Sequence, residues 1–392
     1  MSGRRVYLDH NATTPLRAPV RAAWLEALER LRGNPSSVHA AGREARHLLD
    51  TARERAAAAL GVGEDEVLFT SGGTESNNLA LLGALAAHPR GARAGLVTTA
   101  VEHSSVLGPA RRLAAAGRPV EIVGVDGAAR VDPGEVVERA VRCAAGLVSV
   151  MAANNEVGTL GPLAELGAAL GDLDPGHRPL LHTDAVQALG RTPLDLAGWG
   201  IDLATLSAHK LGGPVGVGLL VRRSAVPLEP LLCGGEQEGG LRPGTEDVAG
   251  ASAAALAVEL AVAERESHAP RLRELEGHLC TSLMTRVPAA RLLGPPLGSP
   301  DRLPGTLNVL LPGVEGKVLV TRLDLEGLEA SAGSACASGS LEPSHVLLAM
   351  GLDERAARAG LRLSLGRAST WEDVRQAVDI LVKTCGGNGA RR

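Results

Sequence analysis

The sequence Leu180-Leu-His-Thr183, followed soon after by Leu203-Ala-Thr-Leu-Ser207, decides the fold of this chain. Each stretch is a short, mostly apolar run that ends on a polar residue, a pattern typical of strands covered by helices on both faces. Similar runs and intervening helix-like segments continue on both sides, at residues 67–70, 95–99, 120–123, 147–151 and 217–221 for strands and 43–60, 75–87, 105–116 and 133–143 for helices. We therefore predict an α/β fold whose mostly parallel, seven-stranded sheet binds ligands at the carboxyl ends of its strands.

The alternation of strand-like and helix-like segments ends after residue 248. An Ala-rich segment at 249–266 predicts a long helix that leads into a second region. That region has helix-like segments at residues 270–287, 342–350 and 370–383 and strand-like segments at 306–311 and 361–365. We predict a smaller α+β domain here, formed by residues 1–14 and 261–392, beside a large domain of residues 15–260.

Composition excludes several classes of protein. The 392 residues are 45% hydrophobic with a net charge of −4 and 1% aromatic residues, which argues against disorder, nucleic-acid binding and an anionic membrane surface. No run of about 18 apolar residues occurs, and the first residues lack a secretory signal. The five cysteines are scattered and contain no C-x-x-C pair. We expect a cytoplasmic protein with reduced thiols, without a membrane segment, disulfide framework or structural metal site.

Two residues at the ends of the apolar runs suggest cofactor chemistry. The chain has lysine only at 210, 317 and 383, and Lys210 lies in a Gly-rich turn where it could form a Schiff base with an aldehyde. Position alone would favour a surface lysine in a turn over this role. Asp184 could pair with a pyridinium nitrogen and make the ring an electron sink, while Gln187 could hydrogen-bond the phenolic oxygen of that ring. Asp184 by itself is also compatible with a helix N-cap.

Two small-residue segments could complete such a site. Ser71-Gly-Gly-Thr-Glu75 predicts a strand, a glycine turn and a helix start, which would offer free N–H groups and the Thr74 hydroxyl to a phosphate, or else an ordinary capped helix. Cys336 lies among Ser, Gly and Ala residues that cannot build an apolar pocket, so its thiol could be accessible and nucleophilic. We expect the remaining cysteines to be small buried hydrophobes: Cys143, Cys233, Cys280 and Cys385.

In combination these segments resemble the pyridoxal-phosphate-dependent cysteine desulfurases of the IscS/NifS type, in the class V aminotransferase group with PLP-dependent transferase fold type I. The resemblance runs almost end to end. Its motifs in the first half of the chain are Leu8-Asp-His-Asn-Ala-Thr-Thr-Pro15, Gly33-Asn-Pro-Ser-Ser-Val-His39, Ser71-Gly-Gly-Thr-Glu-Ser-Asn77, Glu102-His-Ser-Ser-Val106 and Asn154-Asn-Glu-Val-Gly158. Those in the second half are His182-Thr-Asp-Ala-Val-Gln187, Ser207-Ala-His-Lys210, Arg242-Pro-Gly-Thr245, Gly333-Ser-Ala-Cys336, Leu341-Glu-Pro-Ser344 and Arg362-Leu-Ser-Leu-Gly-Arg367.

The resemblance implies a role for each site residue. Lys210 would hold pyridoxal 5′-phosphate covalently, with Asp184 on the ring nitrogen and Gln187 on the ring oxygen. His103 would stack on the ring and move protons, Asn155 would lie beside cofactor and substrate, and Arg362 would bind the substrate carboxylate. The residues implied for the phosphate are Gly73, Thr74, Ser207, His209 and, from the other subunit of a homodimer, Thr245.

The implied reaction removes sulfur from L-cysteine, giving L-alanine and a persulfide on Cys336 for an iron–sulfur scaffold, tRNA thiolation or another acceptor. No resident metal is implied, although Cys336 could contact an iron–sulfur cluster on a scaffold partner. A selenocysteine lyase or an aminotransferase on the same scaffold, or a non-catalytic sulfur-transfer partner, are the alternatives. Val215, Glu236 and Pro243 depart from the family pattern near the expected cofactor mouth or dimer contact.

Overall fold

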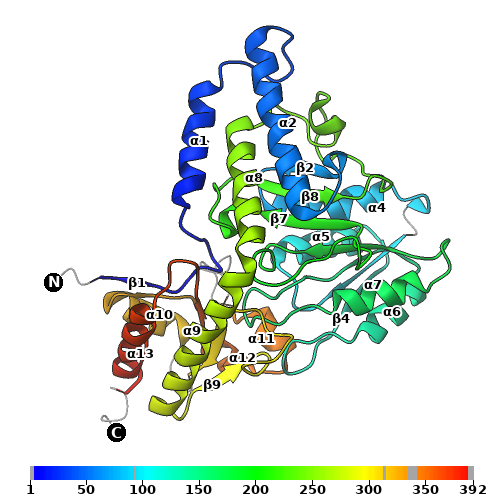
Figure 1. Cartoon of the computed structure of the whole chain (residues 1–392). Coiled ribbons are helices and arrows are strands. Elements are labelled where there is room, and N and C mark those ends of the chain that lie inside the picture. The colour runs from blue at the N-terminus through cyan, green and yellow to red at the C-terminus, as the bar shows by residue number, and fades with distance from the viewer. Residues whose placement is uncertain (1–3, 92–93, 312–314, 334–341, 387–392) are drawn as a thin grey trace.

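A seven-stranded sheet forms the centre of the larger part of the molecule (Figure 1). The computed structural model describes residues 4–91, 94–311, 315–333 and 342–386. The strands follow the spatial order β2-β8-β7-β6-β5-β3-β4, and β8 alone among them runs antiparallel to its neighbours. Their bounds are β2 Val67–Thr70, β3 Gly95–Thr99, β4 Val120–Val123, β5 Ala145–Ser149, β6 Leu180–Asp184, β7 Leu203–Ser207 and β8 Gly218–Arg222. The predicted seven-stranded, mostly parallel sheet is confirmed.

Side chains alternate between the two faces of this sheet, because successive residues of a strand point in opposite directions. In β8, Leu219 and Val221 join one buried cluster and Leu220 joins another. In β5, Leu147 and Val148 divide in the same way. Both faces are apolar, which explains why the strands appear in the sequence as continuous apolar runs.

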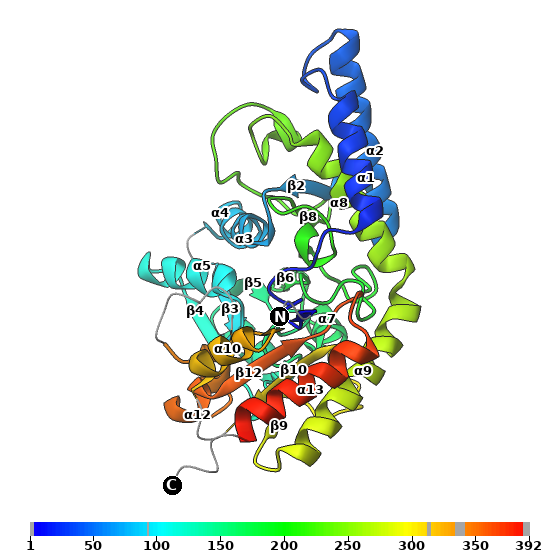
Figure 2. The same cartoon turned by 90° about the vertical axis from the view of Figure 1, so that its left-hand side faces the viewer.

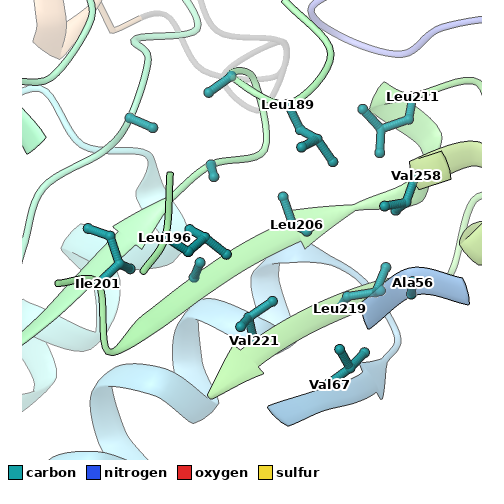
Figure 3. Close-up of a cluster of buried hydrophobic side chains, with 14 of the residues drawn as sticks. Ala56, Val67, Leu189, Leu196, Ile201, Leu206, Leu211, Leu219, Val221 and Val258 are labelled. Carbon is teal, nitrogen blue, oxygen red and sulfur yellow. The ribbon is translucent and has the colours of Figure 1, made fainter. Parts of the chain in front are cut away.

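Helices cover both faces of the sheet. One face packs against α1 (Ala18–Arg30), α2 (Ala40–Leu60), α6 (Pro133–Arg142), α7 (Leu163–Gly171) and α8 (Val248–Ala263). Figure 3 shows part of this core, where side chains of the strands meet residues of α2 and α8 such as Ala56 and Val258. The other face packs against α5 (Ser104–Ala115) and a continuous helix made of α3 (Gly73–Asn78), a π-helical segment (Leu79–Gly83) and α4 (Ala84–Ala86).

The remainder of the chain forms a smaller layer of strands and helices with its own apolar core, below the large sheet in Figure 2. Its three-stranded antiparallel sheet has the order β12-β10-β9, and β1 pairs in parallel with β11. The strands are β1 Val6–Tyr7, β9 Arg291–Leu293, β10 Thr306–Leu310, β11 Leu328–Glu329 and β12 Gly360–Ser364. The helices are α9 Arg265–Arg286, α10 Gly316–Leu325, α11 His345–Ala349, α12 Glu354–Arg358 and α13 Trp371–Gly386. The domain boundaries at residues 14 and 260 stay a prediction.

The two layers are joined by a helical break at Glu264, between α8 and α9. The Glu264 carboxylate pairs with Arg17, which precedes α1, and with Arg367, which follows β12. One carboxylate therefore connects the start of the large layer to the end of the small sheet. None of the helices in the described ranges combines the length and apolar character that a membrane crossing requires.

Several elements differ from their predicted form. The expected helix at residues 75–87 begins at Gly73 and contains a π-helical segment, which no periodicity in the sequence signals. Helices α1, α7, α10 and α12 and the short strands β1, β9 and β11 were not predicted. These strands span only two or three residues, too few to produce an alternating pattern.

A buried ion pair anchors α9 to the chain before β10. Glu276 and Arg302 are each 3% exposed in their side chains. Glu276 also accepts a hydrogen bond from the backbone nitrogen of Gly305 at 2.8 Å, and Arg302 donates to the carbonyls of Pro295 and Thr306. Removal of either partner would leave an uncompensated charge in the core.

We predict that Glu276→Gln lowers the free energy of unfolding by about 3–5 kcal/mol, because it leaves the Arg302 charge buried and unpaired. Urea denaturation followed by circular dichroism measures this change. The control is Glu372→Gln at the exposed Arg375–Glu372 pair, where we expect a loss of less than about 1 kcal/mol. Equal losses in the two variants would contradict the assigned role of the buried pair.

Candidate functional site

A cavity of about 190 Å³ opens at the carboxyl ends of β6 and β7. Asp184 is the last residue of β6, Ser207 is the last residue of β7, and Lys210 ends the 3₁₀ turn Ala208–Lys210 that follows β7. The predicted residues that line this single cavity are Gly73, Thr74, His103, Asn155, Asp184, Gln187, Ser207, His209, Lys210 and Arg362. Segments far apart in the sequence thus meet where parallel strands end.

The Lys210 side chain reaches toward the N-terminal segment. Its Nζ donates hydrogen bonds to the backbone carbonyls of Asn11 at 2.5 Å and Ala12 at 2.6 Å. The amine is partly buried and lies in the wall of the cavity. An amine in this position can react with an aldehyde that enters the cavity.

The carboxylate of Asp184 is 6% exposed and is held by neutral donors. Asn77 Nδ2 donates to its Oδ2 at 2.7 Å, and the backbone nitrogen of Val186 donates to its Oδ1 at 3.1 Å. A buried carboxylate of this kind is stabilised by a cationic N–H group. The protonated nitrogen of a pyridine ring in the cavity would supply one.

The start of α3 offers space for a group that approaches the backbone closely. Gly72 has φ of +149°, a conformation that favours glycine. A Cβ at Gly73 would meet the side chain of Val186 at 3.1 Å, so a larger residue would crowd this wall of the cavity. Thr74 and Ser207, which both carry hydroxyls, line the same cavity. These donors fit the requirements of a phosphate group.

His209 contributes a neutral ring to this part of the cavity. Burial, and then the neighbouring Lys210, lower the pKa of His209 to about 4. Its Nδ1 lies 3.1 Å from the hydroxyl of Thr13. At neutral pH the ring can therefore accept one hydrogen bond and donate another without carrying charge.

A chain of hydrogen bonds fixes the proton on His103. Asn77 Nδ2 donates to Ser105 Oγ at 2.8 Å, and the Ser105 hydroxyl lies 2.7 Å from His103 Nδ1. The backbone nitrogen of Ser105 also donates to His103 Nδ1 at 3.2 Å. Since Nδ1 accepts, we assign the proton of the neutral ring to Nε2. Asn77 thus connects the supports of Asp184 and His103.

Arg362 is 1% exposed, and its two terminal nitrogens contact other residues of the chain. Its Nη2 pairs with Asp9 Oδ1 at 2.8 Å, and its Nη1 donates to the carbonyl of Asn155 at 3.2 Å. The Nε atom has no hydrogen-bond partner in the described structure. A guanidinium held in this way is oriented in advance for a carboxylate in the cavity.

Sequence reasoning assigned no role to several polar residues of the site. Asn11, Asn77 and Ser105 lie within or beside the quoted motifs, but only the fold shows that they contact Lys210, Asp184 and His103. Glu102 is completely buried, and burial raises its pKa to about 8. The signal that could have indicated them is the presence of polar residues in otherwise apolar strand ends.

The remaining predicted residues lie elsewhere. Thr245 is exposed and does not line the cavity, and Cys336 lies outside the described residues. Val215, Glu236 and Pro243 also do not line the cavity, and their expected place near its mouth or at a dimer contact stays a prediction.

The other cysteines differ from one another. Cys280 is buried, and Cys143 and Cys385 are partly buried, whereas Cys233 is exposed. The expectation that Cys233 is a buried hydrophobe is therefore wrong, because its segment lies on the surface. Within the described ranges no group of three or more His, Cys, Asp and Glu side chains could hold a metal ion.

Comparison with known proteins adds an independent observation. The family Aminotransferase class-V matches residues 6–377. The chain is 42% identical to cysteine desulfurase IscS of Dictyoglomus turgidum, over 96% of this chain and 94% of that protein. It is 41% identical to cysteine desulfurase IscS of Methanosarcina thermophila, over 96% of this chain and 91% of that protein. A solved NifS-like protein is similar with a TM-score of 0.89 at 36% identity, over 98% of this chain and all of that chain (100%).

The structure also predicts a loss of stability in acid. His182 lies two residues before Asp184 in β6 and is completely buried. Burial lowers the pKa of His182 from 6.5 to about 3. The unfolded chain therefore binds a proton below pH 6.5 that the folded chain rejects. The stability that His182 contributes is complete above pH 6.5 and falls by about 1.4 kcal/mol per pH unit as the pH decreases below that value.

We expect the free energy of unfolding of the wild type to decrease between pH 7.5 and pH 5 by about 2 kcal/mol more than that of His182→Gln. Urea denaturation at the two pH values measures the difference. His177→Gln, at an exposed histidine, serves as the control and should keep the wild-type pH dependence. The same pH dependence in His182→Gln would show that His182 is not buried as a neutral ring.

Proposed function

The chain belongs to the aminotransferase class-V family, in its cysteine desulfurase branch, and from this premise we propose that it binds pyridoxal 5′-phosphate around Lys210 and removes sulfur from L-cysteine. The observation that carries the proposal is that Lys210 and the buried carboxylate Asp184 line one cavity. An amine for the aldehyde and an anion for the ring nitrogen are the two groups that this coenzyme needs most.

The residues of the cavity bind the coenzyme, transfer protons and orient the substrate. When bound, pyridoxal phosphate supplies an electron-withdrawing ring that stabilises negative charge on the substrate carbon beside the amine. The carboxylate of Asp184 would keep the ring nitrogen protonated, and Asn77 and the backbone nitrogen of Val186 keep this carboxylate in place. Gly73, Thr74, Ser207 and His209 bind the phosphate. Because His209 is neutral, it can donate to that group without a charge of its own.

Two groups of the chain handle protons. Lys210 Nζ would hold the coenzyme aldehyde and, once the amine of the substrate has displaced it, would hold the proton taken from the substrate carbon. His103 carries its own proton on Nε2, because Ser105 occupies Nδ1. His103 Nε2 is thus the atom of this ring that exchanges a proton with groups in the cavity, and the Asn77–Ser105 chain keeps it in that state.

Arg362 and Asn155 orient the amino-acid substrate. The pair with Asp9 holds the guanidinium in one direction, in the wall of the cavity that a substrate carboxylate would enter. The chain that leads to Cys336 starts beside this arginine. The backbone nitrogen of Ser331 donates to the carbonyl of Arg362 at 3.2 Å, and the nitrogen of Arg362 donates to the carbonyl of Ser331 at 2.7 Å.

In this proposal the thiolate of Cys336 attacks the sulfur atom of the bound substrate. The bond from that sulfur to the substrate carbon breaks, its electron pair stays on the carbon side, and protonation gives L-alanine. The sulfur remains on Cys336 as a persulfide, which a sulfur-acceptor protein or an iron–sulfur scaffold then takes. The solved structure of a similar protein, SspA, is described as a complex with cysteine. SspA is 31% identical to this chain with a TM-score of 0.76, and the match covers 92% of this chain and 98% of that chain.

We predict that Lys210→Ala lowers the rate of alanine and sulfide formation from L-cysteine by about 10²–10⁴-fold, since it removes the proton-holding amine. Cys336→Ala should abolish sulfide release in the presence of a thiol reductant. Matched controls are Lys317→Ala and Cys233→Ala, which change a lysine and an exposed cysteine outside the cavity and should keep wild-type rates.

The outcomes separate the alternative functions. Full sulfide release by Cys336→Ala would contradict the desulfurase mechanism. Transfer of the amino group to a keto acid without sulfide would support an aminotransferase instead. A wild-type protein that binds the coenzyme but neither releases sulfide from L-cysteine nor transfers an amino group to a keto acid would favour a non-catalytic sulfur-transfer partner.

The proposal includes a homodimer in which Thr245 reaches the phosphate in the partner's site. Thr245 is exposed, and Gly244 before it has φ of +105°. Arg242, in the same segment, donates to Glu75 Oε1 at 3.1 Å and so holds this segment near the start of α3. We expect static light scattering to give the molar mass of two chains, and a fully active monomer would contradict the shared site.

A further inference from the structure

Arg191 does not line the cavity itself, but it contacts two residues that do, Asn11 and Gln187. In all it contacts three segments of the chain. Its Nη2 donates to Gln187 Oε1 at 2.9 Å and to Asn11 Oδ1 at 2.8 Å. Its Nη1 donates to Thr306 Oγ1 at 3.2 Å. The loop after β6, the N-terminal segment and the first residue of β10 therefore meet at this guanidinium.

These contacts fix the orientation of the Gln187 amide. A guanidinium has donors and no acceptor, so the atom of Gln187 that faces Arg191 must be the oxygen. The opposite end, Nε2, then faces the other way and donates to the backbone carbonyl of Asn11 at 3.0 Å. A side-chain amide nitrogen has two hydrogens, so Gln187 retains one donor for the cavity that it lines.

The same guanidinium orders the carbonyl that holds Lys210. With Asn11 Oδ1 on Arg191, Asn11 Nδ2 donates to the carbonyl of Asn155 at 3.0 Å and to Thr306 Oγ1 at 3.0 Å. The Asn11 side chain is thus held from both sides, and the residue is 2% exposed. Its backbone carbonyl accepts from both Gln187 Nε2 and Lys210 Nζ.

Arg191 is also a buried charge with unusual surroundings. It is 8% exposed, and no carboxylate of the described residues lies within ion-pair distance of it. Burial and then the neighbouring charge of Arg362 lower the pKa of Arg191 to about 10, whereas Glu276 acts to raise it, so Arg191 remains a cation at neutral pH. Because a buried cation favours negative charge nearby, it stabilises an anion on the cavity side of Gln187.

We propose that Arg191 is a positioning residue that locks the Gln187 amide with its N–H toward the cavity, so that Gln187 donates to the ring oxygen of the coenzyme and favours its ionised form. The inference rests on the proposed binding of pyridoxal phosphate in this cavity. Without Arg191, the carbonyl of Asn11 alone holds the Gln187 amide, so a rotated amide that presents its oxygen and repels an ionised ring oxygen becomes more populated.

The test uses the full-length protein in four forms: wild type, Arg191→Met, Gln187→Met and the double variant. Two quantities are measured: the dissociation constant of pyridoxal 5′-phosphate for the coenzyme-free protein, and the midpoint of the pH-dependent absorbance change of the bound coenzyme. We expect Arg191→Met to raise the dissociation constant about tenfold, as for a lost hydrogen bond to a charged group. It should move the midpoint up by about one pH unit, since the ionised ring oxygen loses its donor and a nearby cation.

The double variant shows whether Arg191 acts through Gln187. If it does, Arg191→Met in the Gln187→Met background shifts the midpoint by less than half of its shift in the wild type. Arg191→Lys, which keeps the charge and a donor, should recover at least half of the shift. If Arg191→Met cannot be purified in folded form, Arg191→Gln takes its place with the same expectations.

The control is Arg178→Met, which breaks the contacts of Arg178 with Asp202 and Gly200 away from the cavity. It should leave both measured quantities as in the wild type. Equal midpoint shifts in both Gln187 backgrounds, no shift at all, or the same shift in Arg178→Met would each overturn the inference. A wild-type protein that binds no pyridoxal phosphate would instead overturn the proposed function on which it rests.

Discussion

The hydrogen bonds from Lys210 Nζ to the carbonyls of Asn11 and Ala12 are the interaction on which the site depends. They join the turn after β7 to a segment almost two hundred residues earlier in the chain. The ends of parallel strands supply Asp184 and Lys210, yet they do not by themselves close a cavity. The N-terminal segment completes it, because it lies across the strand ends and accepts from the reactive amine.

The same segment connects the two layers of the molecule. Asp9 pairs with Arg362 of β12, Asn11 contacts Thr306 of β10, and the backbone nitrogen of Thr14 donates to the carbonyl of His209 at 3.1 Å. A substrate carboxylate on Arg362 and a coenzyme on Lys210 would therefore bind to parts of one hydrogen-bonded unit. Burial of this unit excludes water and strengthens each of its charge interactions.

The sequence predicted the large sheet well, because most of its strands are buried on both faces and are therefore largely apolar. It also indicated Asp184 and Lys210, since each is a charged residue at the end of an apolar run. It could not indicate Arg191 or Asn77 as supports of the site, because their partners are brought near by the fold alone. The π-helical segment at Leu79–Gly83 and the short strand β1 gave no periodic signal for the same physical reason: their form depends on tertiary packing.

The central claim is that Lys210 is the amine that binds an aldehyde coenzyme. The most direct measurement is reduction of the coenzyme-loaded protein with borohydride, followed by proteolysis and mass spectrometry, because the chain contains lysine only at positions 210, 317 and 383. The account predicts the mass of the reduced coenzyme on the peptide that contains Lys210 and unmodified peptides for Lys317 and Lys383. A label on either of those two lysines, or no covalent label on a protein saturated with pyridoxal phosphate, would contradict it.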